Sequence, residues 1–274
     1  MADLGVSLSL LALFVLLSEA TRITAIKLLT KRDYCIYVME IISTFQLCAC
    51  THELKLLGEV GRIEPQIGLT LTYLISVVHA VTFHGAIGNP SGALEHIYRR
   101  NLTGKCAIAR VACQFLGAVV ARAVIPYVWA LGLSDLHLRH KLFGFKCISP
   151  INATLPRAAA VELACAFAVQ TAVLHIHKVD EKYRAHVVAA VITALVYAAG
   201  SITGAVFNPA LAFSTQFSCS GHTFAEYSFV YWLGPVLGVA SSLLLFDKVI
   251  PTLYGKGYYQ KDLDFPFFET KKIL

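Results

Sequence analysis

The sequence has 274 residues, of which 57% are hydrophobic and 15% are charged, and its formal net charge at pH 7 is +6. Soluble domains hold roughly 45–50% apolar and about 25% charged residues. This composition excludes a soluble enzyme, a disordered chain and a nucleic-acid-binding protein as first interpretations. In a membrane protein, the informative property of the positive charge is its distribution among the segments that connect the membrane-spanning elements.

Seven apolar segments follow one another along the chain. They cover residues 4–20 (with an extension to 30), 34–51, 66–84, 107–131, 156–177, 186–207 and 228–247. A helix needs about 20 apolar residues to cross a bilayer, and most of these segments reach that length. The strict alternation of apolar and polar residues that membrane β-strands require is not seen. The sequence predicts an all-α membrane protein with short connections and one compact bundle.

The first segment leaves three alternatives open: a spanning helix, a cleaved signal peptide and an interfacial helix. The start Met1-Ala2-Asp3 lacks the positive flank of a signal peptide, whereas Glu19 and Arg22 interrupt the apolar run, as they would in an interfacial helix. We favour an ordered, extra N-terminal helix.

Lys and Arg residues gather in alternate connections. Fourteen lie in residues 27–35, 84–106, 178–186 and 248–274, whereas the other connections hold five: Lys55, Arg62, Arg139, Lys141 and Lys146. Cytosolic connections of membrane proteins carry the excess of Lys and Arg. The C-terminus is therefore predicted to lie in the cytosol.

The sequence contains an internal duplication. Gly85-Ala86-Ile87-Gly88-Asn89-Pro90 and Gly204-Ala205-Val206-Phe207-Asn208-Pro209 match at one offset of 119 residues. Each half reads as two helices, an Asn-Pro segment and a third helix, and three crossings per half give an inverted repeat. The expected parts are an N-terminal segment 1–33, a first repeat 34–131, a connecting loop 132–155, a second repeat 156–247 and a cytosolic tail 248–274.

The Asn-Pro pairs predict two short helices. Asn is a favoured N-cap and Pro is a favoured first helical residue. Asn89 and Asn208 should therefore cap helices that begin at Pro90 and Pro209.

Both short helices should re-enter the membrane as half-helices, because residues 91–98 and 210–217 are too few to span it. Irregular backbone at membrane depth needs burial in protein or a wet cavity, and Gly85 and Gly204 permit the turn before each Asn-Pro pair. The facing positive helix ends would repel cations and protons, while the Asn amides donate hydrogen bonds to a passing oxygen.

These features resemble the aquaporins. The second box of that family, Asn208-Pro209-Ala210, is intact, and the first is altered to Asn89-Pro90-Ser91. The narrower similarity is to the superaquaporin subgroup, carried by Phe45-Gln46-Leu47-Cys48-Ala49-Cys50-Thr51-His52-Glu53-Leu54, Ser134-Asp135-Leu136-His137-Leu138 and Tyr231-Trp232-Leu233-Gly234-Pro235. Ser7-Leu8-Ser9 and Cys219-Ser220-Gly221-His222-Thr223 favour its branch named aquaporin twelve. The resemblance implies six spanning helices, two half-helices, a pore within each subunit and a homotetramer.

The outer filter departs from that family. Leu211 stands where the family carries Arg, and counting back from the boxes puts Leu69, Val196 and Ala205 at the other wall positions. The family's filter combines an aromatic side chain, His and Arg, whereas all four positions here are apolar. Either such a constriction admits small neutral solutes such as glycerol, or it dewets and conducts poorly.

Two carboxylates, Glu40 and Glu162, lie inside the first helix of each half. Ionisable groups within membrane spans are rare without a role. We expect each to accept hydrogen bonds from the unwound backbone of its own half's box, and a proton relay is the alternative.

The histidines and cysteines give no sign of a metal site, a cofactor or an enzyme. His79, His84, His175 and His177 lack an acidic or Cys partner at ligand spacing, so they are interpreted as satisfied or interfacial side chains. A second interpretation makes His84 a gate of the cytosolic vestibule that responds to protonation. The eight cysteines show no paired spacing and are interpreted as buried small apolar residues.

Two kinds of short motif concern glycosylation and targeting within the cell. Asn101 and Asn152 both begin a glycosylation sequon, but the predicted topology puts only Asn152 in the lumen. Lys271 and Lys272, near the cytosolic C-terminus, resemble the dilysine signal for retrieval to the endoplasmic reticulum.

We therefore expect an intracellular membrane channel that passes water and small neutral solutes such as glycerol. The alternatives are a poorly conducting scaffold of the same fold and a coupled secondary transporter, for which the sequence offers no charged substrate site beyond Glu40 and Glu162.

Overall fold

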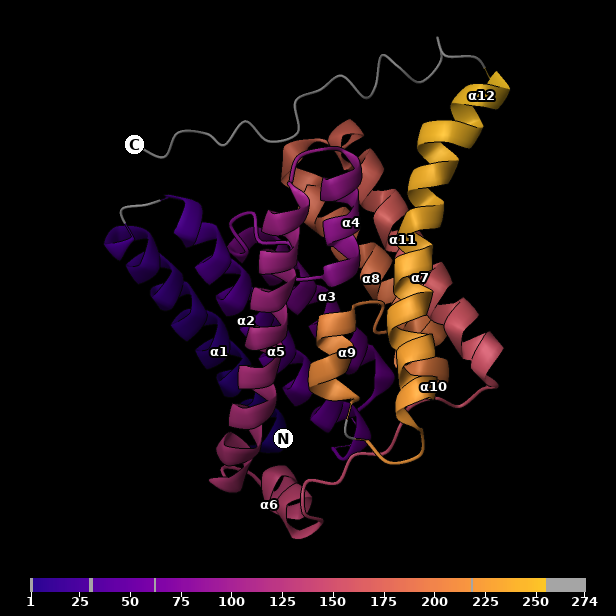
Figure 1. Cartoon of the computed structure of the whole chain (residues 1–274). Helices are drawn as coiled ribbons and strands as arrows, with labels where there is room; N and C mark the ends of the chain where they lie inside the picture. The colour runs from indigo at the N-terminus through magenta and orange to yellow at the C-terminus, as the bar shows by residue number, and fades with distance from the viewer. Residues whose placement is uncertain (1, 30–31, 62, 218, 255–274) are drawn as a thin grey trace.

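The computed structural model describes residues 2–29, 32–61, 63–217 and 219–254, and these are almost entirely helical (Figure 1). The helices are α1 (Ala2–Leu28), α2 (Arg32–Glu59), α3 (Pro65–Thr82), α4 (Pro90–Tyr98), α5 (Gly104–Ala130), α6 (Asp135–Leu142), α7 (Leu155–His175), η1 (Ile176–Lys178), α8 (Glu181–Thr203) and α9 (Pro209–Thr215). One continuous helix then follows, made of α10 (Phe224–Ser228), η2 (Phe229–Leu233), α11 (Gly234–Leu244), η3 (Leu245–Val249) and α12 (Ile250–Tyr254).

Within the described residues, seven helices are long and apolar enough to cross a membrane, which agrees with the seven apolar segments. Their ends differ from the sequence-based bounds for local reasons. The helix predicted over 34–51 continues to Glu59, because polar residues of its last turns are buried and hydrogen-bonded. The segment predicted over 186–207 stops at Thr203, because Gly204 has a left-handed backbone with φ +83°.

The two halves repeat one packing scheme. α2 packs against α5 and α7 packs against α11, each pair at a glycine. A Cβ atom at Gly117 would collide with the carbonyl of Ile41, and one at Gly238 would collide with the carbonyl of Leu163. These glycines therefore allow the helices to approach closely.

The two half-helices lie at opposite levels of the bundle, α4 in the upper half and α9 in the lower half of Figure 1. α4 packs against α11 of the other half, and α9 packs against α5 of the other half. Each half-helix therefore packs against the last helix of the opposite half: α4 against α11, and α9 against α5.

α1 is an ordered helix that belongs to this bundle, as the sequence analysis favours. Near its start, Ser7 Oγ donates to Glu53 Oε1 at 2.5 Å. The same carboxylate accepts a hydrogen bond from Trp129 Nε1 at 2.8 Å and contacts His137 Nε2 at 3.1 Å. The side chains of Glu53 and His137 are both fully buried. We call these four residues the Glu53 cluster.

Near the end of α1, a second polar group ties it to α2 and α3. Arg22 is fully buried, and its guanidinium donates to Glu19 at 2.8 Å and to Gln46 at 2.6 Å. Gln46 in turn donates to Thr82 at 3.1 Å, and Glu19 pairs with His84 at 2.9 Å. His84 therefore has a partner on α1, next to the segment that leads into the first box.

The connections at one end of the bundle are joined by a disulfide between Cys147 and Cys219. The interpretation of all eight cysteines as buried apolar residues is therefore wrong for these two. They are 72 residues apart in different connections, so no local spacing could reveal the bond. Cys48, Cys50 and Cys165 are buried, as expected, whereas Cys35, Cys106 and Cys113 are only partly buried. We call this the disulfide end, and it is the lower end in Figure 1, where α6 lies.

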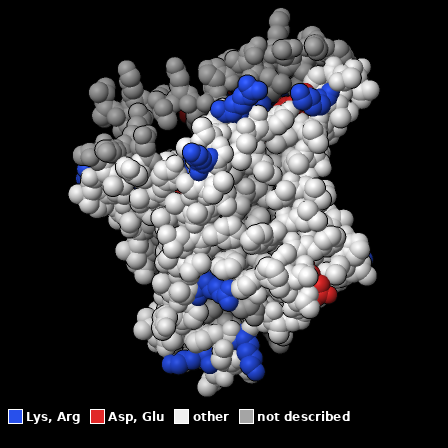
Figure 2. Space-filling model, in the orientation of Figure 1, with Lys and Arg blue, Asp and Glu red and all other residues white. Residues whose placement is uncertain are grey.

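Charged side chains are unevenly distributed over the surface that Figure 2 shows. On the face shown in Figure 2, Lys and Arg gather toward the two ends, and a broad band between them is almost free of charge. Such a band is what lipid tails would cover.

The Glu53 cluster yields a prediction about stability. Glu53→Leu leaves three buried polar side chains without their acceptor, so it should lower the free energy of unfolding by about 3–5 kcal/mol. The melting temperature of the detergent-purified protein would measure this. Glu64→Leu, at an exposed position, is the control, and equal melting temperatures of the two variants would contradict the prediction.

Candidate functional site

The site is built around the two Asn-Pro boxes, which open the half-helices. Asn89 is the N-cap of α4, and its side-chain oxygen accepts a hydrogen bond from the amide of Ser91 at 2.9 Å. Asn208 caps α9 in the same way, accepting from the amides of Ala210 at 3.0 Å and Leu211 at 3.3 Å. Both Asn side chains are thereby fixed with the oxygen toward their own helix.

The opposite face of each Asn amide reaches the other half of the chain. Asn89 Nδ2 donates to the carbonyl of Phe207 at 3.3 Å, and Asn208 Nδ2 donates to the carbonyl of Gly88 at 2.8 Å. A side-chain amide has two N–H groups. Each Asn therefore keeps one N–H beyond this cross-link that can be offered to a passing oxygen.

The backbone before each box turns through left-handed conformations. Gly85 and Gly204 have φ of +84° and +83°, which glycine adopts without a steric penalty. Ala205 and Phe207 also have positive φ, +48° and +37°. Such conformations are unfavourable for residues with a Cβ and persist only where the surroundings impose them. Sequence analysis did not reveal this strain, because neither residue type indicates it.

A buried carboxylate in each half holds that backbone. Glu40 accepts hydrogen bonds from the amides of Ile87 at 2.9 Å and Gly88 at 3.0 Å. Glu162 accepts from the amides of Val206 at 3.1 Å and Phe207 at 2.5 Å. Both carboxylates thus lie at the box of their own half, where the sequence analysis expects them.

The remaining partners of the two carboxylates differ. Glu40 also accepts from Gln114 at 3.0 Å and lies 3.5 Å from the guanidinium of Arg110. Glu162 accepts from the hydroxyl of Thr203 at 2.6 Å. The first half therefore balances its buried charge with a cation, whereas the second relies on a hydroxyl and backbone amides.

The four expected wall residues do not form one cluster. Val196 and Ala205 pack together with Cys165. Leu211 packs in the neighbouring cluster that contains Val206. Leu69 lies apart from these contacts and lines an open groove between α3 and α8, with Tyr73 and Tyr197 among its other lining residues.

Sequence analysis missed two residues of α2 that reach the C-terminal turn of α9. Lys55 Nζ donates to Gln216 Oε1 at 3.0 Å and to the carbonyl of Thr215 at 3.3 Å. One turn earlier, His52 Nε2 lies 3.1 Å from Ser214 Oγ. The signal available was a Lys and a His three residues apart within an apolar helix, and so on one face of it.

Of the predicted glycosylation site and the predicted retrieval signal, the first lies within the described residues and the second does not. Asn152 is exposed at the disulfide end, and its Nδ2 donates to the carbonyl of Ser201 at 3.0 Å. Lys271 and Lys272 lie outside the described residues. Among the residues that are described, no group of three or more His, Cys, Asp or Glu side chains could hold a metal ion.

Comparison with known proteins gives a consistent set of similarities. Residues 59–246 match the family model "Major intrinsic protein". The chain is 40% identical to Aquaporin-11 of Equus caballus over 95% of its length and 96% of that protein, and 36% identical to Putative aquaporin-12A of Homo sapiens over 94% and 85%. The identity with Aquaporin-11 is the higher of the two, so these comparisons do not favour the aquaporin-twelve branch over the Aquaporin-11 relatives.

Among solved structures, the X-ray structure of the aquaglyceroporin from Plasmodium falciparum is similar, with a TM-score of 0.61. The match covers 80% of this chain and 97% of that one, at 17% sequence identity. At this identity the likeness concerns the fold alone.

The carboxylate of the second half yields a prediction about folding. In Glu162→Gln, an amide NH₂ would face a backbone N–H, so the variant should lose about 1–3 kcal/mol of stability. Melting temperature and the yield of assembled protein would measure the loss, with Glu181→Gln as the control at an exposed position. Normal folding together with an altered pH dependence of flux would instead support a proton relay.

Proposed function

Because this chain belongs to the major intrinsic protein family, whose members include the aquaporins, we propose that it is a channel for the passive passage of water and small neutral solutes such as glycerol. One observation carries the proposal. The amides of Asn89 and Asn208 come from two opposed half-helices and meet at the cross-linked boxes.

The boxes suit an uncharged permeant with an oxygen atom. Each Asn amide offers an N–H donor, and each half-helix N-terminus points its partial positive charge at the meeting point. A water molecule or a hydroxyl group accepts those hydrogen bonds, whereas a cation or a hydrated proton is repelled. The cross-links between the boxes fix the donors in place, so they need no rearrangement when a permeant arrives.

The wall beyond the boxes supports passage of small neutral solutes. Val196, Ala205 and Leu211 are apolar, so they offer no hydrogen bond that would favour water over a small alcohol. The same apolar wall supports the alternative of a poorly conducting scaffold, since water can leave a narrow apolar constriction. Leu211 stands at the wall position where the family carries Arg.

We place the channel in the membrane of the endoplasmic reticulum, with the disulfide end in the lumen and the C-terminus in the cytosol. The excess of Lys and Arg in alternate connections supports this orientation. The disulfide supports it independently, because such bonds persist in oxidising compartments. Asn152 lies at the same end, where it would be accessible to glycosylation.

A homotetramer is the assembly we propose. α3 and α8 are the least buried of the candidate spans, although both are apolar. Their outer faces would be covered by neighbouring subunits or by lipid.

The proposal predicts rapid osmotic water flow. Proteoliposomes that contain the wild-type chain should shrink faster than empty liposomes in stopped-flow light scattering after a sucrose challenge. Asn208→Asp removes the amide of one of the two box asparagines. The shrinkage rate of this variant should therefore equal that of empty liposomes. A glycerol challenge measures whether the apolar wall admits that solute. Rates equal to those of empty liposomes, from folded tetramers, would favour the scaffold.

The retrieval signal predicts a change of location. Replacing Lys271 and Lys272 by Ala should send part of the protein to the cell surface, as measured by surface biotinylation. Replacing Lys256 and Lys261, which lie in the same tail but outside the motif, is the control. An unchanged distribution would contradict the signal.

A further inference from the structure

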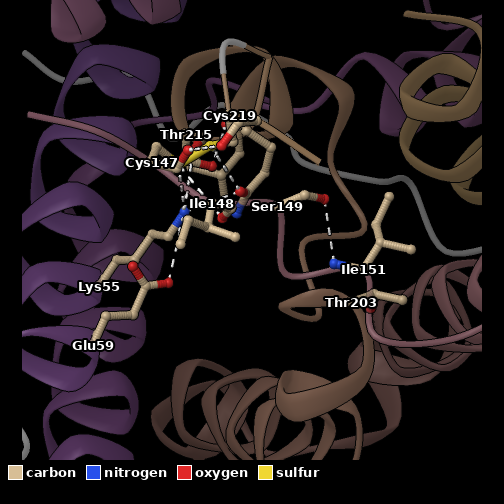
Figure 3. Close-up of polar contacts among 12 residues, drawn as sticks. Lys55, Glu59, Cys147, Ile148, Ser149, Ile151, Thr203, Thr215 and Cys219 are labelled. Carbon is tan, nitrogen blue, oxygen red and sulfur yellow. Dashed lines mark hydrogen bonds and ion pairs between the residues drawn. A yellow bond between two sulfur atoms is a disulfide. The ribbon is translucent and has the colours of Figure 1, made fainter. Parts of the chain in front are cut away.

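Lys55 is a cation held inside the disulfide end of the bundle. Its Nζ lies 3.0 Å from Gln216 Oε1, 3.3 Å from the carbonyl of Thr215 and 3.4 Å from Cys147 Sγ. Figure 3 shows the side chain pointing from α2 toward the disulfide and the end of α9. Only 17% of the side chain is exposed. The ammonium is therefore fixed in place, unlike that of an ordinary surface lysine.

The positive charge of Lys55 is only weakly balanced. Its three closest partners are a carbonyl, an amide oxygen and a sulfur atom, all of them neutral. Glu59 Oε1 is 3.7 Å away, but the side chain of Glu59 is 54% exposed. Water screens a carboxylate that is about half exposed, so Glu59 compensates the ammonium only in part.

Lys55 lies one side chain away from the expected pore wall. Gln216, which accepts its hydrogen bond, is buried and reaches across to the turn before the second box. A Cβ atom at Gly204 would lie 3.6 Å from Gln216 Nε2. The next residue along the chain is Ala205, one of the wall residues. Gln216 thus links the ammonium to the backbone that enters the pore.

The surroundings of Nζ are rigid. The disulfide joins the loop before α7 to the loop after α9. Two backbone hydrogen bonds reinforce it, from Ser149 N to the carbonyl of Ser220 at 2.8 Å and from Ser220 N to the carbonyl of Cys147 at 2.9 Å. These bonds hold the acceptors of Lys55 at fixed positions, so the ammonium stays beside the end of α9.

We propose that Lys55 is a fixed cation at the channel mouth of the disulfide end. It comes from α2 and supplies a positive charge that the half-helix itself lacks, since Leu211 stands where the family carries Arg. The inference rests on the proposed channel function and names a residue that sets its selectivity. A positive charge beside the pore raises the free energy of an approaching proton or metal cation and leaves that of a neutral solute almost unchanged. Lys55 therefore adds charge exclusion to a wall that is otherwise apolar.

The experiment compares four chains in proteoliposomes: wild type, Lys55→Gln, Lys55→Arg and Glu59→Gln. Stopped-flow light scattering measures water flow, and the decay of a pH gradient reported by trapped pyranine measures the proton leak. Lys55→Gln keeps a hydrogen-bond donor but loses the charge, and Lys55→Arg keeps the charge. Glu59→Gln is the matched control one turn further along α2, because it removes the opposite charge. Melting temperature and an intact disulfide confirm folding.

The expected result is a proton leak at least about tenfold higher in Lys55→Gln than in the wild type, at unchanged water flow. Lys55→Arg should stay at the wild-type level, and Glu59→Gln should not exceed it. Equal leaks in Lys55→Gln and the wild type, with water flow present, would overturn the role of Lys55 and leave the channel intact.

Three further outcomes also have defined consequences. If wild-type water flow equals that of empty liposomes, the proposed function fails, and the role of Lys55 fails with it. If Lys55→Gln does not fold, Lys55→Met is the second neutral variant, since Met keeps the apolar stem, and the same tenfold rise is expected of it. A rise in leak in Glu59→Gln contradicts the proposal whatever the Lys55 variants do.

Discussion

Irregular backbone inside a membrane needs hydrogen-bond partners from the protein itself, since lipid supplies none. In this bundle the residues before each box meet that constraint through one buried carboxylate per half. Glu40 binds the amides of Ile87 and Gly88, and Glu162 binds those of Val206 and Phe207. The carboxylates fix the turns, the turns orient the capping asparagines, and the asparagines begin the half-helices. The geometry at the centre of the channel thus depends on two side chains that do not themselves cap either half-helix.

Much of this arrangement could be predicted from the sequence, because it repeats. The Asn-Pro pairs and the Glu residues recur at similar spacing, and N-cap preference and helix length then dictate half-helices. The parts that escaped prediction do not repeat. The disulfide joins Cys147 to Cys219 across 72 residues, and the contacts of Lys55 with Thr215 and Gln216 depend on which face of α2 meets α9. Contacts of this kind follow from tertiary packing, which one sequence does not reveal.

The N-terminal helix shows the same contrast between what the sequence pattern predicts and what tertiary packing determines. Its apolar length predicted a membrane segment, but Glu19 and Arg22 also suited an interfacial helix. The structure buries Arg22 against Glu19 and Gln46, while Ser7 joins the Glu53 cluster at the other end. Burial of such groups is tolerable only when each polar atom has a partner. The two polar residues that made the segment ambiguous therefore attach it to the bundle, Arg22 to α2 and Glu19 to His84 after α3.

The two halves differ most in how they treat charge, and the difference bears on selectivity. In the first half, Arg110 lies beside Glu40, so the carboxylate that shapes its turn has a compensating cation. In the second half, Glu162 has a hydroxyl and amides as partners. Lys55, which comes from α2 of the first half, is bound by neutral oxygens at the end of α9. A cation without a close buried carboxylate acts over a longer range than a paired one. The repeat thus keeps its hydrogen-bond geometry symmetric, whereas the charges that accompany its two carboxylates differ.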